Sequence, residues 1–182
     1  AIRYTLDGSP PGNSSPIYAA PLLLKKTTEV KAILTLEGWP DSPVSSRTFA
    51  RARYPVKSTK LSARPNEKYP GSGTKTLYDG KKGSNVFSDG AWLGYFAENL
   101  TVTADLGQAE AVKGVTIGVL SDFNSYIHPP TAIEVAISVD GKNFGDYTRK
   151  DISIPEQLTE AHVQNHYLAV NATEKVRFLK IR

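Results

Sequence analysis

The stretch of sequence that decides the fold runs from Leu77 to Gly107 and reads LYDGKKGSNVFSDGAWLGYFAENLTVTADLG. Its last part, Leu100 to Leu106, places leucine, valine and alanine on one face and threonine and aspartate on the other. This alternation predicts a half-buried β-strand that ends at Gly107. Two Asp-Gly turn signals and a glycine-rich loop with three aromatic residues come before it.

Similar alternating runs recur along the chain between turn signals, and no long helical pattern interrupts them. We expect further strands at residues 1–5, 28–36, 43–49, 111–120, 133–139, 146–152, 162–170 and 176–181. Short strands at this spacing are typical of β-sandwiches, so the sequence predicts an all-β protein.

Composition excludes several classes of protein. The 182 residues hold 22 basic and 18 acidic side chains, a net charge of +4, without the basic stripe that nucleic-acid binding requires. There is no cysteine, hence no disulfide or thiolate metal site. No apolar run approaches the roughly 18 residues that span a membrane, so we expect no membrane insertion.

Two domains are expected. Residues 50–68 are rich in Arg, Lys, Pro and Ser and show little periodicity, which is typical of a boundary. We therefore predict one domain at residues 1–52 and a second at residues 53–182.

The larger domain resembles a known family. LYDGKKGS, DGAWLGY and LTVTADLG, followed by PPTAIEVAISVDGKNF and VRFLKIR, are similar to the discoidin or coagulation factor V/VIII type C domain, and more narrowly to family 32 carbohydrate-binding modules. The resemblance runs from about residue 56 to the last residue. It implies a galactose-binding-domain-like jelly-roll sandwich, of which the last strand is expected to be missing.

The smaller domain carries a second resemblance. IRYTLDGSPP, SSPIYAAPL and EVKAILTLEGWP are similar to the Ig-like domain that follows the catalytic domain in bacterial chitobiase and β-hexosaminidase-type enzymes. That domain begins with a strand that is absent here, so we expect an N-terminally truncated Ig-like sandwich with a spacer role.

Together the resemblances imply a non-catalytic accessory region of a secreted glycoside hydrolase, located in the periplasm, outside the cell or on the surface of a bacterium. Its implied partners are glycans with N-acetylhexosamine or galactose-type termini, and its own upstream catalytic domain. No pair of carboxylates suited to glycoside hydrolysis stands out in the sequence, so we expect no enzyme activity. A protein-interaction or cell-adhesion module and a purely structural spacer are the alternatives, because one fold hosts several functions.

Candidate ligand-binding residues lie in two loops, at residues 89–99 and 122–130, where Trp and Tyr offer stiff faces for sugar rings. By position in the family, the expected contacts are Trp92, Tyr95, Asp122, Asn124, Tyr126, His128 and Tyr69. The competing interpretation places Trp92 and Phe96 in the core and packs Tyr126 beneath Pro129.

A calcium site is also implied by the resemblance, in the segment TLYDGKKGS. Its ligands would be the carbonyl oxygens of Thr76 and Lys81, the carboxylate of Asp79 and Ser84, all hard oxygen donors of the kind that Ca²⁺ takes. The alternative is an Asp-Gly turn that holds no ion.

Overall fold

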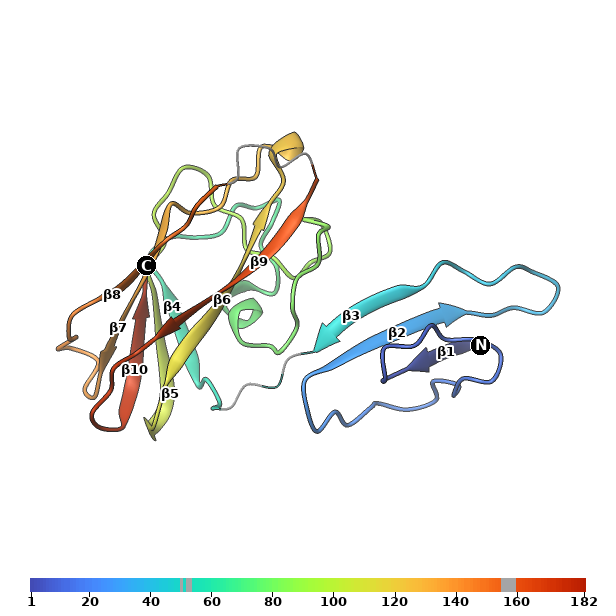
Figure 1. Cartoon of the computed structure of the whole chain (residues 1–182), viewed down its shortest axis with the longest axis horizontal. Coiled ribbons are helices and arrows are strands. Elements are labelled where there is room, and N and C mark those ends of the chain that lie inside the picture. Colours follow the sequence, from blue (N-terminus) through green and yellow to red (C-terminus); the bar gives the residue numbers. More distant parts are fainter. Residues whose placement is uncertain (50, 52–53, 155–159) are drawn as a thin grey trace. The chain divides into compact units, whose positions relative to one another are not determined.

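The protein is described by a computed structural model that covers residues 1–49, 51, 54–154 and 160–182 (Figure 1). Its regular elements are β-strands and two short 3₁₀ turns, η1 (Gly73–Leu77) and η2 (Phe123–Ser125). The all-β class expected from the alternating pattern is confirmed. No helix among the described residues has the length and apolar character to span a membrane.

The chain divides into two compact units. The first unit comprises Ala1–Ala52 with Gly80–Lys82, and the second comprises Arg53–Asp79 with Gly83–Arg182. The domain boundary predicted between residues 52 and 53 lies outside the described residues.

The first unit is one antiparallel sheet with the strand order β1-β2-β3, formed by β1 (Ile2–Thr5), β2 (Thr28–Leu34) and β3 (Ser45–Phe49). The outer edge of β1 is partly covered, because the Tyr18 amide donates to the Ile2 carbonyl at 2.8 Å. Among the described residues of this unit, only Pro11, Thr28 and Ile33 are buried. The unit therefore has a sheet but almost no closed core.

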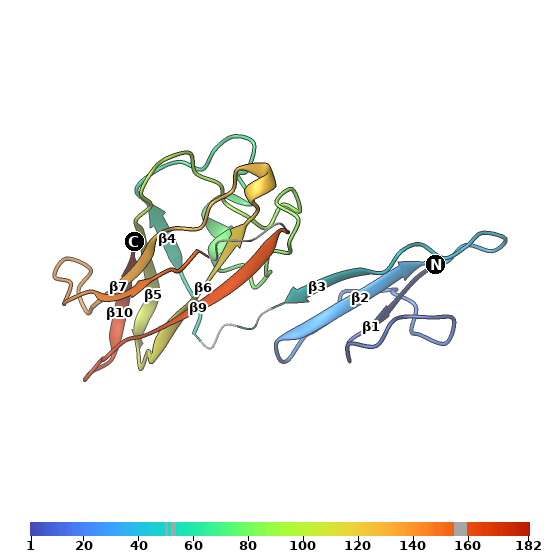
Figure 2. The same ribbon diagram turned by 45° about the horizontal axis from the view of Figure 1, so that its top comes forward.

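The second unit is a sandwich of two antiparallel sheets (Figures 1 and 2). The larger sheet has the order β4-β5-β10-β7-β8 and the smaller pairs β6 with β9. These strands are β4 (Ser58–Leu61), β5 (Val102–Glu110), β6 (Gly114–Ser121), β7 (Ala132–Ser138), β8 (Thr148–Asp151), β9 (His162–Ala169) and β10 (Val176–Ile181).

Alternate residues of both sheets fill the core of the second unit. Val102, Ala104 and Leu106 of β5 are buried, as the pattern predicts, while Thr103 and Asp105 between them are half-buried. Val135 of β7 and Leu168 of β9 meet in the same apolar cluster. Packing between inward faces in this way is what holds a β-sandwich together.

The strands begin or end within a few residues of their predicted ranges, and at the end of β5 the structure shows the reason for the difference. β5 does not end at Gly107 but continues to Glu110. Gly107 has φ 82°, which only glycine adopts without strain, and the pairing with β10 shifts register between Val176 and Phe178. The extra residues form a β-bulge, so the glycine bends the strand instead of terminating it.

An ion pair lies at this bulge. The Arg177 guanidinium donates two hydrogen bonds to the Asp105 carboxylate, at 2.8 and 2.9 Å. These charge-assisted bonds lower the pKa of Asp105 to about 2. The pair joins the two central strands of the larger sheet, β5 and β10.

Candidate functional site

The first of the two candidate loops, predicted at residues 89–99, continues a segment that begins at Gly83, and residues 83–96 are together named the aromatic loop. Its tryptophan is built into the loop: Trp92 Nε1 donates to the Ser84 carbonyl at 3.0 Å. A Cβ atom added to Gly83 would lie 2.2 Å from the indole ring, so the ring lies directly on that glycine. Half-buried and hydrogen-bonded, Trp92 fixes the path of the loop.

An aspartate holds the aromatic loop closed beneath Trp92. The Asp89 carboxylate accepts from the Ser84 amide and hydroxyl, both at 2.9 Å, and from the Ala91 amide at 2.8 Å. This is the local bonding that favours Asp before Gly in turns. The second Asp-Gly signal of the sequence therefore orders the loop.

Tyr69 belongs to the same assembly, although it comes from the segment before η1. Backbone hydrogen bonds join Asn66 and Tyr69 to Gly94, and a Cβ on Gly94 would lie 2.9 Å from the Tyr69 Cβ. Its ring meets Phe87 edge to face, with 5.8 Å between centroids. Tyr69 thus ties two segments together as a half-buried scaffold residue.

The two residues after Gly94 lie in opposite environments. The Tyr95 hydroxyl is closed off from solvent and has no hydrogen-bond partner among the described residues, and burial raises its pKa. Phe96, by contrast, is 84% exposed. The interpretation of Phe96 as a core residue is wrong, and no local signal in the sequence separates it from Tyr95.

The second candidate loop, residues 122–130, is named here the Tyr126 loop. Asp122 and Ile127 exchange two backbone hydrogen bonds of 2.9 Å, which close the loop at its base. The buried Asp122 side chain also accepts from the Ser125 amide, at 3.3 Å, and so caps η2. Asp122 therefore shapes this loop from beneath.

Tyr126 stands at the tip of its loop. It has φ 57°, a left-handed conformation that a bulky residue rarely adopts, and 87% of it is exposed. The interpretation that Tyr126 packs beneath Pro129 is wrong. Such strain persists where the surrounding structure imposes it, and it is concentrated at functional sites.

Polar side chains accompany this exposed ring. Asn124 and His128 are both exposed, and the His128 ring meets Phe123 edge to face, with 4.9 Å between centroids. The imidazole is thereby oriented by an aromatic neighbour while its nitrogens remain near solvent. An exposed ring, an amide and an imidazole on one short loop can together bind a polar ligand that has an apolar face.

The contacts thus gather the predicted ligand-binding residues into two groups. Tyr69, Trp92 and Tyr95 belong to the aromatic loop and its supports, while Asp122, Asn124, Tyr126 and His128 belong to the Tyr126 loop.

The predicted calcium ligands have other bonds of their own. The Ser84 hydroxyl donates to Asp89, and Lys81 groups with the first unit, where its backbone pairs with Phe49. At Thr76 it is the hydroxyl oxygen, and not the carbonyl oxygen predicted as a ligand, that accepts from the Ser72 amide, at 2.6 Å. Among the described residues, no three His, Cys, Asp or Glu side chains gather as metal ligands. The calcium site stays a prediction, and equal thermal midpoints in calcium and in chelator would contradict it.

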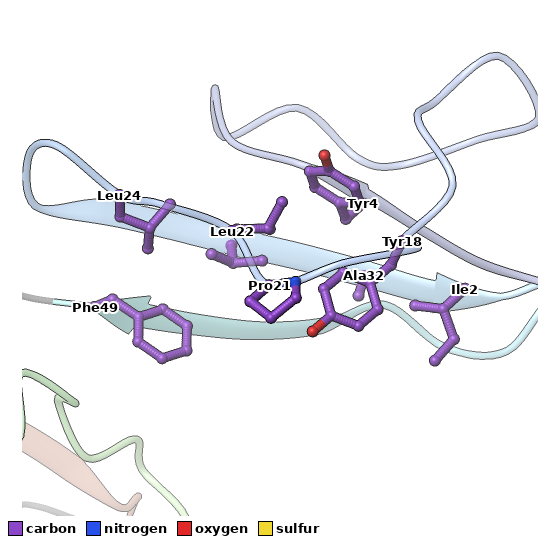
Figure 3. Close-up of a pocket in the computed structure, with 9 residues that line it drawn as sticks. Ile2, Tyr4, Tyr18, Pro21, Leu22, Leu24, Ala32 and Phe49 are labelled. Atoms are coloured by element: carbon purple, nitrogen blue, oxygen red, sulfur yellow. The ribbon is translucent and has the colours of Figure 1, made fainter.

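The first unit holds an open apolar groove of about 340 Å³ on its sheet (Figure 3). Tyr4 and Tyr18 meet there edge to face, with 6.4 Å between ring centroids. The lining residues come from all three strands and from the segment before β2: Ile2, Tyr4, Tyr18, Pro21, Leu22, Leu24, Val30, Ala32 and Phe49. Among its described lining residues, the polar side-chain groups are the hydroxyls of Tyr4 and Tyr18.

Comparison with known proteins bears on the first unit. A family model described as "Fn3 associated" matches residues 1–49. No curated protein matches the chain. The fold and this match define an all-β protein whose residues 1–49 are similar to the "Fn3 associated" family.

Proposed function

We propose that the second unit is a non-catalytic carbohydrate-binding module. The observation that carries this proposal is the conformation of Tyr126, a large aromatic ring held in a left-handed backbone conformation and 87% exposed at the tip of a closed loop. Burial would have removed this ring from water, and the fold instead leaves it facing solvent. An exposed tyrosine offers a large contact area, and with only two side-chain torsions it loses little side-chain entropy on binding.

The ligand suggested by this chemistry is a neutral sugar ring. One face of a pyranose carries C–H groups that pack on an aromatic ring, while its hydroxyls exchange hydrogen bonds with amides and imidazoles. In the proposed complex Tyr126 stacks on the sugar, and Asn124 and His128 bind its hydroxyls. N-acetylhexosamine and galactose-type termini are the proposed ligands, in line with the family resemblance.

The wider proposal concerns the protein to which this chain belongs. We infer an accessory region of a secreted, periplasmic or surface-attached bacterial glycoside hydrolase of the β-hexosaminidase or chitobiase type. The first unit is then a spacer between this module and an upstream catalytic domain, a role compatible with its fibronectin-III-associated match. A weak sugar contact on such a tether raises the effective concentration of substrate near the active site.

A glycan array tests the proposal directly. The wild-type chain is compared with Tyr126→Ala, which removes the ring, and with Tyr126→Phe, which keeps the ring and removes the hydroxyl. We expect selective binding to neutral glycans by the wild type and by Tyr126→Phe, and a loss of at least about tenfold for Tyr126→Ala, equivalent to 1.4 kcal/mol.

A folded wild type that binds none of the glycans would overturn this proposal and favour a protein-interaction or spacer role. Binding that survives Tyr126→Ala unchanged would remove the Tyr126 loop from the site.

A further inference from the structure

A second exposed aromatic ring lies on the outward face of the smaller sheet. Tyr167 of β9 is paired with Thr116 of β6 and is 54% exposed. Its hydroxyl donates to the Lys113 carbonyl at 3.1 Å. A Cβ atom added to Gly114 would lie 2.5 Å from the Tyr167 Cζ, so the ring lies on the backbone of β6 and its other face is open to solvent.

The positions beside this ring also face outward. Val115, Ile117 and Val119 of β6 pack against the core, so the residues between them point to the other side of the sheet. Gly118 lies opposite Asn165, and a Cβ at Gly118 would meet only the Asn165 Oδ1, at 3.6 Å. The sheet surface is therefore open next to an exposed amide.

The same face is closed at one end. Leu120 is the next outward position of β6 and is only 7% exposed, yet it is not part of the core cluster. Leu120 is therefore covered on the outward side, where it bounds the open surface. From Gly114 to Gly118 that surface runs roughly 13 Å along the strand, at about 3.3 Å per residue.

The chemistry of this face is neutral. Although 22% of the residues of the chain are charged, the outward positions of the two strands carry no charged side chain: Gly114, Thr116, Gly118, Val163, Asn165, Tyr167 and Ala169. An ionic ligand would lose hydration here without gaining a counter-charge. A ligand with apolar faces and hydroxyl groups can pack on the ring and form hydrogen bonds with Thr116 and Asn165.

We propose that this surface is a second binding site, distinct from the Tyr126 loop, and that it takes an extended neutral oligosaccharide. In this site Tyr167 is the stacking platform, Thr116 and Asn165 bind hydroxyls, and Gly118 leaves room for the sugar. An aromatic ring is also known to stabilise a sheet by covering a cross-strand glycine. If Tyr167 only stabilised the sheet in this way, neither the open space at Gly118 nor the exposed amide of Asn165 would be needed.

The two sites can be separated by backbone amide NMR of the full 182-residue chain, which is titrated with chitohexaose and, in a second experiment, with cellohexaose. The positions of the amides that shift show which site binds the sugar. We expect at least one of the two hexasaccharides to shift the amides of Gly114, Gly118 and Asn165. Shifts in residues 122–130 report on the Tyr126 loop independently, so failure of one proposal is distinguishable from failure of the other.

Gly118→Val is the decisive variant. The position is in a strand without positive φ, so valine is accommodated, and its side chain fills the open surface. We expect binding at this face to weaken by at least about tenfold, while Tyr167→Phe, which keeps the ring, stays within about twofold of wild type. Gly145→Val, at a glycine with similar space in the β7–β8 connection, is the matched control and is expected to bind normally.

Two results would overturn the proposal. One is a titration with both hexasaccharides in which the amides of Gly114, Gly118 and Asn165 do not move. The other is a folded Gly118→Val chain that binds as tightly as wild type, since it would leave Tyr167 with the structural role alone.

Discussion

The aromatic loop and the Tyr126 loop have similar compositions but use their rings in opposite ways. In the aromatic loop, Trp92 lies on Gly83 with its indole nitrogen hydrogen-bonded, and the segment is tied to its neighbours through Gly94. In the Tyr126 loop, the aspartate is buried and the tyrosine is exposed. The difference between these two loops is that the Trp92 ring is fixed as scaffold by its contact with Gly83, whereas the Tyr126 ring is exposed and available to a ligand.

The largest change in stability is expected when Trp92, the scaffold ring, is replaced. Trp92→Ala removes an indole that covers Gly83 and a hydrogen bond to Ser84, and we expect a loss of roughly 2–3 kcal/mol in unfolding free energy, less than most fully buried Trp residues cost because Trp92 is half-buried. Chemical denaturation measures it. A loss below about 0.5 kcal/mol, the size of an ordinary surface substitution, would break the comparison by placing Trp92 on the surface.

The second largest change in stability is expected at Asp122, the buried residue that supports the Tyr126 loop. Asp122→Ala removes the side-chain acceptor of the Ser125 amide, which keeps its 3.0 Å hydrogen bond to the carbonyl of residue 122, and we expect a loss of about 1 kcal/mol, typical of a lost cap, together with loss of glycan binding. Asp122→Asn retains an acceptor oxygen and serves as the control, with most of the stability kept. If Asp122→Ala bound glycans as wild type does, the aspartate would not shape the loop.

A smaller change in stability, of opposite sign, is expected at Tyr126, the exposed ring. Tyr126→Gly relieves the left-handed backbone conformation, so stability should stay level or rise by up to about 1 kcal/mol while glycan binding is lost. Thermal melting checks the expected stability, and a glycan-binding assay on the same sample checks the expected loss of binding. A clear fall in the thermal midpoint would assign Tyr126 a packing role.

The smallest effect is expected at Tyr95. Its buried hydroxyl has no partner among the described residues, so Tyr95→Phe removes an unsatisfied polar group, and we expect a change between zero and about 0.5 kcal/mol in favour of the folded state. Denaturant unfolding resolves this against wild type. A loss of stability would mean that the hydroxyl is hydrogen-bonded in solution, for example to water.

Much of the fold could be predicted because it depends on neighbours along the chain. The alternation from Leu100 to Leu106 corresponds to the observed burial in β5, and β10 coincides with its predicted range, 176–181. The end of β5 was missed because Gly107 is read locally as a terminator, while the pairing with β10 continues the strand through a bulge.

The orientation of the loop aromatics could not be predicted, because it depends on contacts between residues well separated in sequence. Trp92 is fixed by Gly83 and Ser84, and Tyr69 by Gly94, which lies 25 residues further along the chain. Nothing in the segment from Tyr95 to Phe96 distinguishes the buried ring from the exposed one. Tyr167 was not a candidate, since alternation in β9 marks it only as a surface residue.

The Arg177–Asp105 pair at the bulge has a consequence for the conditions under which the second unit stays folded. Because the folded pKa of Asp105 is about 2, below its ordinary 3.8, the stability that this group contributes is fully present above pH 3.8. It is lost only as the pH falls from there through 2. The junction between β5 and β10 is therefore expected to keep its charges at a pH where an unpaired aspartate would already be protonated.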